Sequence, residues 1–173
     1  MNDRTGQRFS ARTGAEGDPP LTLEGFLPHR LLVCAQFVSA ALAKVHAGRH
    51  EIGVPEWRVL VVLAEFGSMT AKAIGQRSHM HKTKVSRAVA VLEELELVTR
   101  RSNTADLREA FLSLTPAGRA IYDQLAPGAL EFADRLIAAI DPADREALDR
   151  ILDRLMQSSA EIAADIANGP RAR

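Results

Sequence analysis

One segment of the 173-residue chain, 81–95, places small and basic side chains on one side of a predicted helix. At about 100° per residue, Val85, Val89 and Leu92 fall on one narrow face, which must turn toward a protein core. The opposite face carries Thr83, Ser86, Arg87 and Ala90, with Lys84 beside them. Arg, Lys, Ser and Thr are the side chains that read base edges in the major groove of DNA. The pattern therefore predicts a helix that docks on a polyanion.

A second group of cationic side chains surrounds the link between two segments of strand character, 97–101 and 110–114. The link, 102–108, is polar and typical of a β-hairpin tip. Arg108 lies in this link, and Arg100 and Arg101 lie directly before it. Such a hairpin beside a recognition helix can place an arginine in the neighbouring minor groove. Asp106 can hold Arg108 extended by a charge-assisted hydrogen bond, or the pair only orders the turn.

The distribution of charge supports this interpretation. The whole chain has 22 basic and 22 acidic residues, for a formal net charge of zero. Residues 68–119 nevertheless hold nine Lys and Arg against five Asp and Glu, whereas residues 120–173 hold six against ten. A neutral protein with a basic middle third indicates one surface for a polyanion and another that is kept away from it.

The elements that must position these side chains are mostly helical. Apolar residues recur at helical spacing over 26–47 and again over 55–66. Thr70 is a suitable N-cap for a short helix over 71–77, which a tight turn joins to the helix 81–95. Helices 71–77 and 81–95 therefore have the layout of a helix-turn-helix.

Two more helices are expected after the hairpin. Thr115-Pro116 and Asp141-Pro142 each combine a capping residue with proline at the first helical position, which begins a helix. We expect a kink at Pro127-Gly128 in the first helix and an end at Gly169-Pro170 in the second. The predicted fold is mainly α with a small β-hairpin wing.

The residues of the hairpin and of the helix before it resemble the MarR family. Asp106-Leu107-Arg108, then five residues, then Leu114-Thr115 and Gly118 match the wing signature D-x-R-x5-L-T-x-x-G of that family. The stretches that are similar to its recognition helix and first wing strand are Lys84-Val85-Ser86-Arg87, Leu92-Glu93 and Leu97-Val98-Thr99-Arg100. The resemblance covers about residues 26–167. It departs at Glu96, where the family usually has a glycine at the helix end.

The resemblance implies a winged helix-turn-helix domain plus an all-helical dimerisation region. It implies a homodimer on double-stranded, pseudo-palindromic operator DNA, usually a repressor released by a ligand or an oxidant. Arg108 would be the minor-groove arginine and Asp106 its positioner. The expected parts are a flexible tail (1–22), a first dimerisation helix and linker (23–54), a winged helix-turn-helix domain (55–118) and C-terminal dimerisation helices (119–168). The predicted DNA-contacting residues are Thr70, Lys72, Lys82, Thr83, Lys84, Ser86, Arg87, Arg101, Asn103, Asp106 and Arg108.

The sequence offers two kinds of sensor. Families of this type hold small aromatic or phenolic ligands where the dimerisation region meets the DNA-binding lobe. The candidate ligand contacts are Arg30, Cys34, His46, His50 and Trp57. The other possibility is a redox switch at Cys34, with His29 and Arg30 one turn earlier to activate the thiol. The alternative for Cys34 is simple core packing, because a lone cysteine on an apolar helix is usually inert.

Several classes of function are not expected. There is no P-loop, G-x-G-x-x-G, G-x-S-x-G elbow or cluster of metal ligands in the sequence, so we expect no enzyme, no cofactor and no metal site. A single cysteine and the lack of an apolar signal segment or membrane-length run favour the cytoplasm. Two alternatives are an enzyme fragment that dimerises through a winged helix and a winged helix that binds another protein. The second would not need basic residues gathered on the helix and hairpin.

Overall fold

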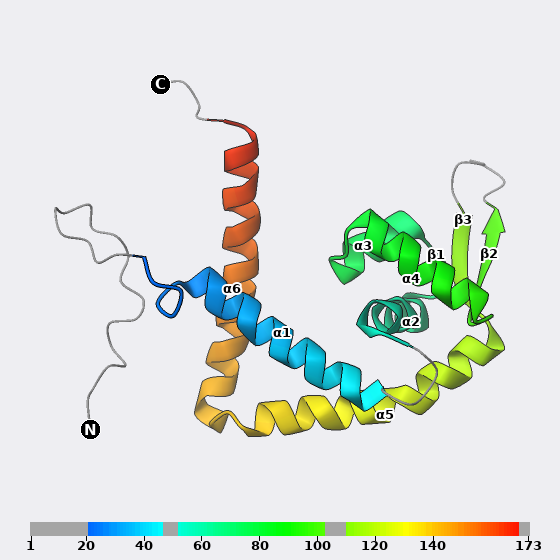
Figure 1. The fold of residues 1–173 in the computed structure, drawn as a ribbon, viewed down its shortest axis with the longest axis horizontal. Coiled ribbons are helices and arrows are strands. Elements are labelled where there is room, and N and C mark those ends of the chain that lie inside the picture. The colour runs from blue at the N-terminus through cyan, green and yellow to red at the C-terminus, as the bar shows by residue number, and fades with distance from the viewer. Residues whose placement is uncertain (1–20, 47–51, 103–109, 170–173) are drawn as a thin grey trace. The chain divides into compact units, whose positions relative to one another are not determined.

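The computed structural model describes residues 21–46, 52–102 and 110–169 (Figure 1). In chain order the elements are α1 (Leu27–His46), α2 (Val54–Phe66), β1 (Met69–Thr70), α3 (Ala71–Ser78), α4 (Lys82–Glu94), β2 (Val98–Ser102), β3 (Ala110–Leu114), α5 (Pro116–Ala138) and α6 (Pro142–Ala167). The predicted helices and hairpin strands are confirmed, with their ends moved by a residue or two. The chain divides inside α5 into two units, Met1–Gly128 and Ala129–Arg173.

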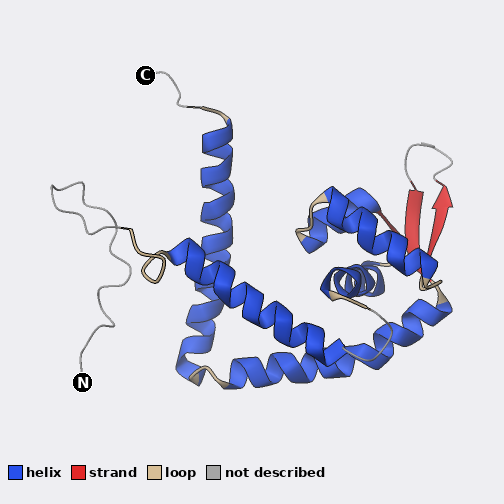
Figure 2. Cartoon of the chain, viewed as in Figure 1, coloured by secondary structure: helices blue, strands red, loops and turns tan. Residues whose placement is uncertain are grey.

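The strands form an antiparallel sheet in the order β1-β3-β2, shown in red in Figure 2. The β2–β3 hairpin was predicted, but β1 was not. Met69 pairs with Leu112 and Thr70 with Phe111, so β3 lies between two neighbours. A strand of two residues is too short to show an alternating pattern, which is why the sequence predicted only a hairpin.

The core of the first unit lies between the helices α2, α3 and α4 and one face of this sheet. Its largest fully buried side chains are Val59, Leu60, Ile74, Val85, Val89, Leu92 and Leu112. Burial of each such side chain stabilises the fold by about 1.5–3 kcal/mol. This core fixes α3 and α4, the two helices of the predicted helix-turn-helix, against the sheet.

The second unit contains the end of α5 and all of α6. Asp141 begins α6, because its carboxylate accepts a hydrogen bond of 2.9 Å from the Ala143 N–H. α5 is one helix with Pro127 in its interior, at the place where a kink was predicted. None of the residues of α6 is buried, and Met156, Ile162 and Ile166 are more than half exposed. None of the helices in the described ranges has the length and apolar character that a transmembrane segment requires.

Candidate nucleic-acid interface

Side-chain and backbone caps define the helix-turn-helix. The Thr70 hydroxyl accepts a hydrogen bond of 3.2 Å from the Ala73 N–H and so begins α3. His79 ends α3 in the left-handed conformation, with φ of 51°. His81 then begins α4, since its Nδ1 accepts from the Thr83 N–H at 3.4 Å. Both histidines therefore help to form the turn between α3 and α4.

α4 divides into the two predicted faces. Val85, Val89 and Leu92 are at most 1% exposed and form part of the core. The opposite side chains, which we call the recognition face, are all exposed: Thr83, Lys84, Ser86, Arg87 and Ala90. A helix with small and cationic side chains on its free face has the shape and charge that the major groove accepts.

The other predicted DNA contacts lie around this face or beyond the described residues. Lys72, Lys82 and Arg101 are exposed, whereas Thr70 is half-buried because it caps α3. Asn103, Asp106 and Arg108 fall in the segment 103–109, which lies outside the described residues. Apart from Thr70, the described residues of the predicted set are thus exposed on α3, α4 and β2.

The two arginines of β2 lie on opposite faces of the sheet. Arg100 pairs with Leu112 and Arg101 with Phe111, and successive strand residues point to opposite sides. Leu112 is in the core, so Arg100 lies on the helix side of the sheet. There it forms a two-pronged ion pair with Glu93 of α4: Nε to Oε1 is 2.8 Å and Nη2 to Oε2 is 2.9 Å. The sequence grouped Arg100 with the arginines of the hairpin, without naming it a DNA contact, and did not predict its partner Glu93.

This ion pair persists at neutral pH. Hydrogen bonds from Arg100 lower the pKa of Glu93 below its ordinary value of 4.5, against the opposing effect of burial. The same bonds raise the pKa of Arg100. Because the carboxyl pKa is lowered in the folded state, the contribution of the pair to stability is complete above pH 4.5 and is lost as the pH falls through the folded-state value.

The turn between α4 and β2 explains two residues of the wing signature. The Thr115 hydroxyl donates to the Glu96 carbonyl at 2.8 Å and accepts from the Gly118 N–H at 3.0 Å. The Thr115 N–H also donates to the Leu97 carbonyl at 3.0 Å. Thr115 therefore caps α5 and ties its start to the turn that precedes the wing.

Glu96 adopts the conformation for which glycine is the usual choice. Its φ is 57°, in the left-handed region. The N–H of the next residue, Leu97, donates a hydrogen bond of 2.8 Å to the Leu92 carbonyl. A side chain with a Cβ is strained there, whereas glycine is not. The departure from the family pattern thus leaves the turn in place but adds strain to it.

Glu96→Gly should therefore stabilise the protein. We expect the free energy of unfolding to rise by about 0.5–1 kcal/mol, because relief of left-handed strain exceeds the added chain entropy of glycine. Urea denaturation measures the change. Glu94→Gly is the matched control, since residue 94 is helical and glycine there should destabilise by about 1 kcal/mol. Equal losses at both positions would contradict the strain at Glu96.

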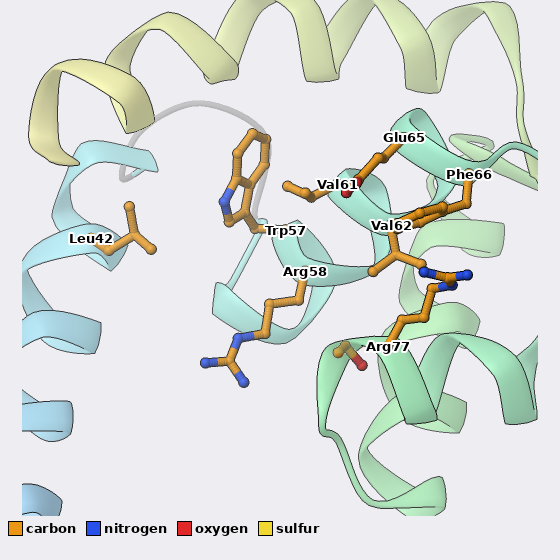
Figure 3. Close-up of a pocket in the computed structure, with 9 residues that line it drawn as sticks. Leu42, Trp57, Arg58, Val61, Val62, Glu65, Phe66 and Arg77 are labelled. Atoms are coloured by element: carbon orange, nitrogen blue, oxygen red, sulfur yellow. The ribbon is translucent and has the colours of Figure 1, made fainter. Parts of the chain in front are cut away.

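A cavity of about 470 Å³ lies in the first unit beside α2 (Figure 3). It is lined by Leu42, Trp57, Arg58, Val61, Val62, Glu65, Phe66, Arg77 and Ser78. Figure 3 shows Leu42 on one side and Phe66 with Arg77 on the other, with Trp57 and Arg58 between them. The Arg77 guanidinium carbon lies 3.8 Å from the centre of the Phe66 ring. The cavity therefore combines aromatic walls with two cations.

Of the predicted ligand contacts, only Trp57 lines this cavity among the described residues. Trp57 is buried and stacks on Tyr122, with ring centres 5.6 Å apart. Arg30 does not line it, and Cys34 is exposed, so Cys34 is not packed in the core of the single chain. His50 and the His46 side chain lie outside the described residues. The sequence missed Arg58 and Arg77, which only the packing of α2 against α3 brings together.

Comparisons with known proteins agree with this architecture. Residues 50–109 match the family model described as MarR family. The chain is 30% identical over 102 residues to the uncharacterized HTH-type transcriptional regulator YwoH of Bacillus subtilis, covering 59% of this chain and 74% of that protein. It is 30% identical over 97 residues to the homoprotocatechuate degradative operon repressor of Escherichia coli, covering 56% and 65%.

The fold is also found among solved structures. The crystal structure of Sco3205, a MarR family transcriptional regulator from Streptomyces coelicolor in complex with DNA, matches with a TM-score of 0.71 and 22% identity. The match covers 80% of this chain and 92% of that one. The predicted fold class, mainly α with a small β wing, is confirmed.

Proposed function

Since the chain belongs to the MarR family of DNA-binding transcriptional regulators, which are not enzymes, we propose that it is a homodimeric repressor of pseudo-palindromic operators, released by a small aromatic ligand. Its proposed place of action is the cytoplasm. The observation that carries the proposal is the exposed recognition face of α4, which stands on the buried Val85, Val89 and Leu92. The name of the similar Escherichia coli protein, an operon repressor, supports the direction of control.

In this proposal Thr83, Ser86 and Arg87 face base edges in the major groove. Lys72, Lys82 and Lys84 are exposed around them and contact phosphates, and the cap residue Thr70 lies at the start of α3. Arg101 points away from α4 toward the neighbouring backbone or minor groove. By motif match, Arg108 enters the minor groove and Asp106 positions it, and Asn103 is a further proposed contact. Phosphate contacts position the protein and base contacts give specificity.

The exposed apolar side chains of α1 and α6 support a homodimer. On α1, Leu32 and Phe37 are 65% and 74% exposed, and on α6 every apolar side chain is at least partly exposed. Large apolar surfaces of this kind usually mark an interface. A second chain also supplies a second recognition helix, which reads a half-site about one DNA turn, roughly 34 Å, away.

The cavity beside α2 is the proposed effector site. A volume of about 470 Å³ accepts a single aromatic ring with its substituents, and Trp57 and Phe66 provide flat walls. Arg58 and Arg77 outnumber Glu65 there, which favours an anionic substituent such as a carboxylate. A second candidate is a thiol switch, and the exposure of Cys34 favours it because an oxidant can reach the sulfur.

A gel-shift series on the DNA upstream of the protein's own gene tests the proposal. We expect specific binding by a dimer, with log K falling against log salt by about 0.9 per neutralised phosphate. A panel of aromatic acids and peroxide, run with the wild type and Cys34→Ser, separates the two candidate effectors. A salt-independent interaction, or equal affinity for unrelated DNA, would contradict operator binding and favour a protein-interaction module.

A further inference from the structure

The ion pair between Glu93 and Arg100 joins the last turn of α4 to the first strand of the wing. Both hydrogen bonds are short, at 2.8 and 2.9 Å. Because they join one edge of the guanidinium to both carboxylate oxygens, they fix the orientation of the guanidinium plane as well as its distance from Glu93. The side chains are 29% and 53% exposed. Exposed ion pairs contribute little to folding stability, so the geometry of this pair matters more than its energy.

Because Arg100 lies on β2, the ion pair can control the angle of this strand, and so of the wing, relative to α4. β2 runs from Val98 to Ser102, and Arg100 is its central residue. Val98, at the base, is already in the core, whereas the residues beyond Arg100 are exposed. Strands rise about 3.3 Å per residue, so a tilt of roughly 10° at the base moves the tip of a five-residue strand by about 3 Å. Such a shift exceeds the tolerance of a hydrogen bond.

We propose that Glu93 is a positioning residue: it holds Arg100, and through it the wing, at the angle to α4 at which helix and wing enter adjacent grooves of the same DNA. This proposal rests on the proposed DNA-binding function. Glu93 touches no DNA itself, because it lies at the end of α4 beyond the recognition face. It also keeps Arg100 from phosphates, so the arginine that faces outward from β2 is Arg101.

The test compares Glu93→Gln with Glu94→Gln on operator DNA with A·T-rich or G·C-rich flanks. Both changes remove one negative charge from the same turn of α4, and loss of that charge alone should tighten binding. We expect Glu93→Gln to weaken binding to the A·T-flanked operator about 3–10-fold and to reduce the preference for A·T flanks. Protection of the bases under α4 should remain, and Glu94→Gln should bind at least as tightly as the wild type.

A charge-reversed pair, Glu93→Arg with Arg100→Glu, keeps the net charge and restores an ion pair at this place. It should recover most of the flank preference lost in Glu93→Gln. Two results would overturn the proposal: equal affinities and flank preferences for Glu93→Gln and Glu94→Gln, or a charge-reversed pair that recovers nothing, which would make Arg100 itself a DNA contact. Absence of specific binding by the wild type would instead refute the proposed function.

Discussion

Gly118→Ala should leave the first unit unfolded, or close to it, at temperatures at which the wild type is folded. A Cβ at residue 118 would overlap the carbonyl oxygen of Leu97 and lie 2.9 Å from its carbonyl carbon. These are backbone atoms, and Leu97 is held by hydrogen bonds to Leu92 and Thr115. Neither side of the contact can move away cheaply. We expect a loss of about 3 kcal/mol or more in the free energy of unfolding.

Thermal and urea unfolding followed by circular dichroism measure this loss. Gly128→Ala is the matched control, because residue 128 lies in the same helix and its added Cβ would meet only a methyl group of Val45, at 3.2 Å. Alanine is the better helix former, so the control should be neutral or stabilising by up to about 1 kcal/mol. If Gly118→Ala melts with the wild type, the contact between α5 and the start of the wing is looser than the structure shows.

Arg87→Ala should produce the largest loss of DNA affinity among the described residues. Arg87 is exposed on the recognition face, and an arginine that donates two hydrogen bonds to a guanine contributes about 1–3 kcal/mol of discrimination. We therefore expect operator binding to weaken roughly 10- to 100-fold and the choice of base at one position in each half-site to relax. Affinity for unrelated DNA should change much less.

Titrations of operator and scrambled DNA at one fixed salt concentration measure both effects. Arg154→Ala is the control for charge, because it removes an exposed arginine from α6 without touching α4. It should change neither affinity by more than about twofold, since α6 carries none of the predicted DNA contacts. Parallel losses on the two DNAs for Arg87→Ala would assign Arg87 to the phosphate backbone and leave the base contacts to Thr83 and Ser86.

Local signals in the sequence predicted much of the fold. Thr70, Asp141 and the Thr115-Pro116 pair begin helices where the structure has them, because caps act within a single turn. The recognition face was also predictable, since three apolar residues at helical spacing determine which side of α4 turns inward.

Features that depend on distant contacts could not be predicted. β1 exists because β3 offers it a free edge, and two residues carry no periodicity of their own. Arg100 has the same residue type as Arg101, and only the register with Leu112 shows which of them meets Glu93. The cavity was missed for the same reason: Arg58 and Arg77 come from different helices, and their neighbourhood depends on the packing of the whole unit.

The exposure of α6 has a consequence for the conditions under which this protein is fully folded. A helix in a protein draws most of its stability from an amphipathic face packed on something else, yet no residue of this 26-residue helix is fully buried. In the proposed homodimer the missing free energy comes from the second chain, so folding of α6 and pairing are a single bimolecular equilibrium. The fraction of chains with a folded α6 then rises with the concentration of the protein, so the amount of functional dimer depends more than linearly on the amount of chain.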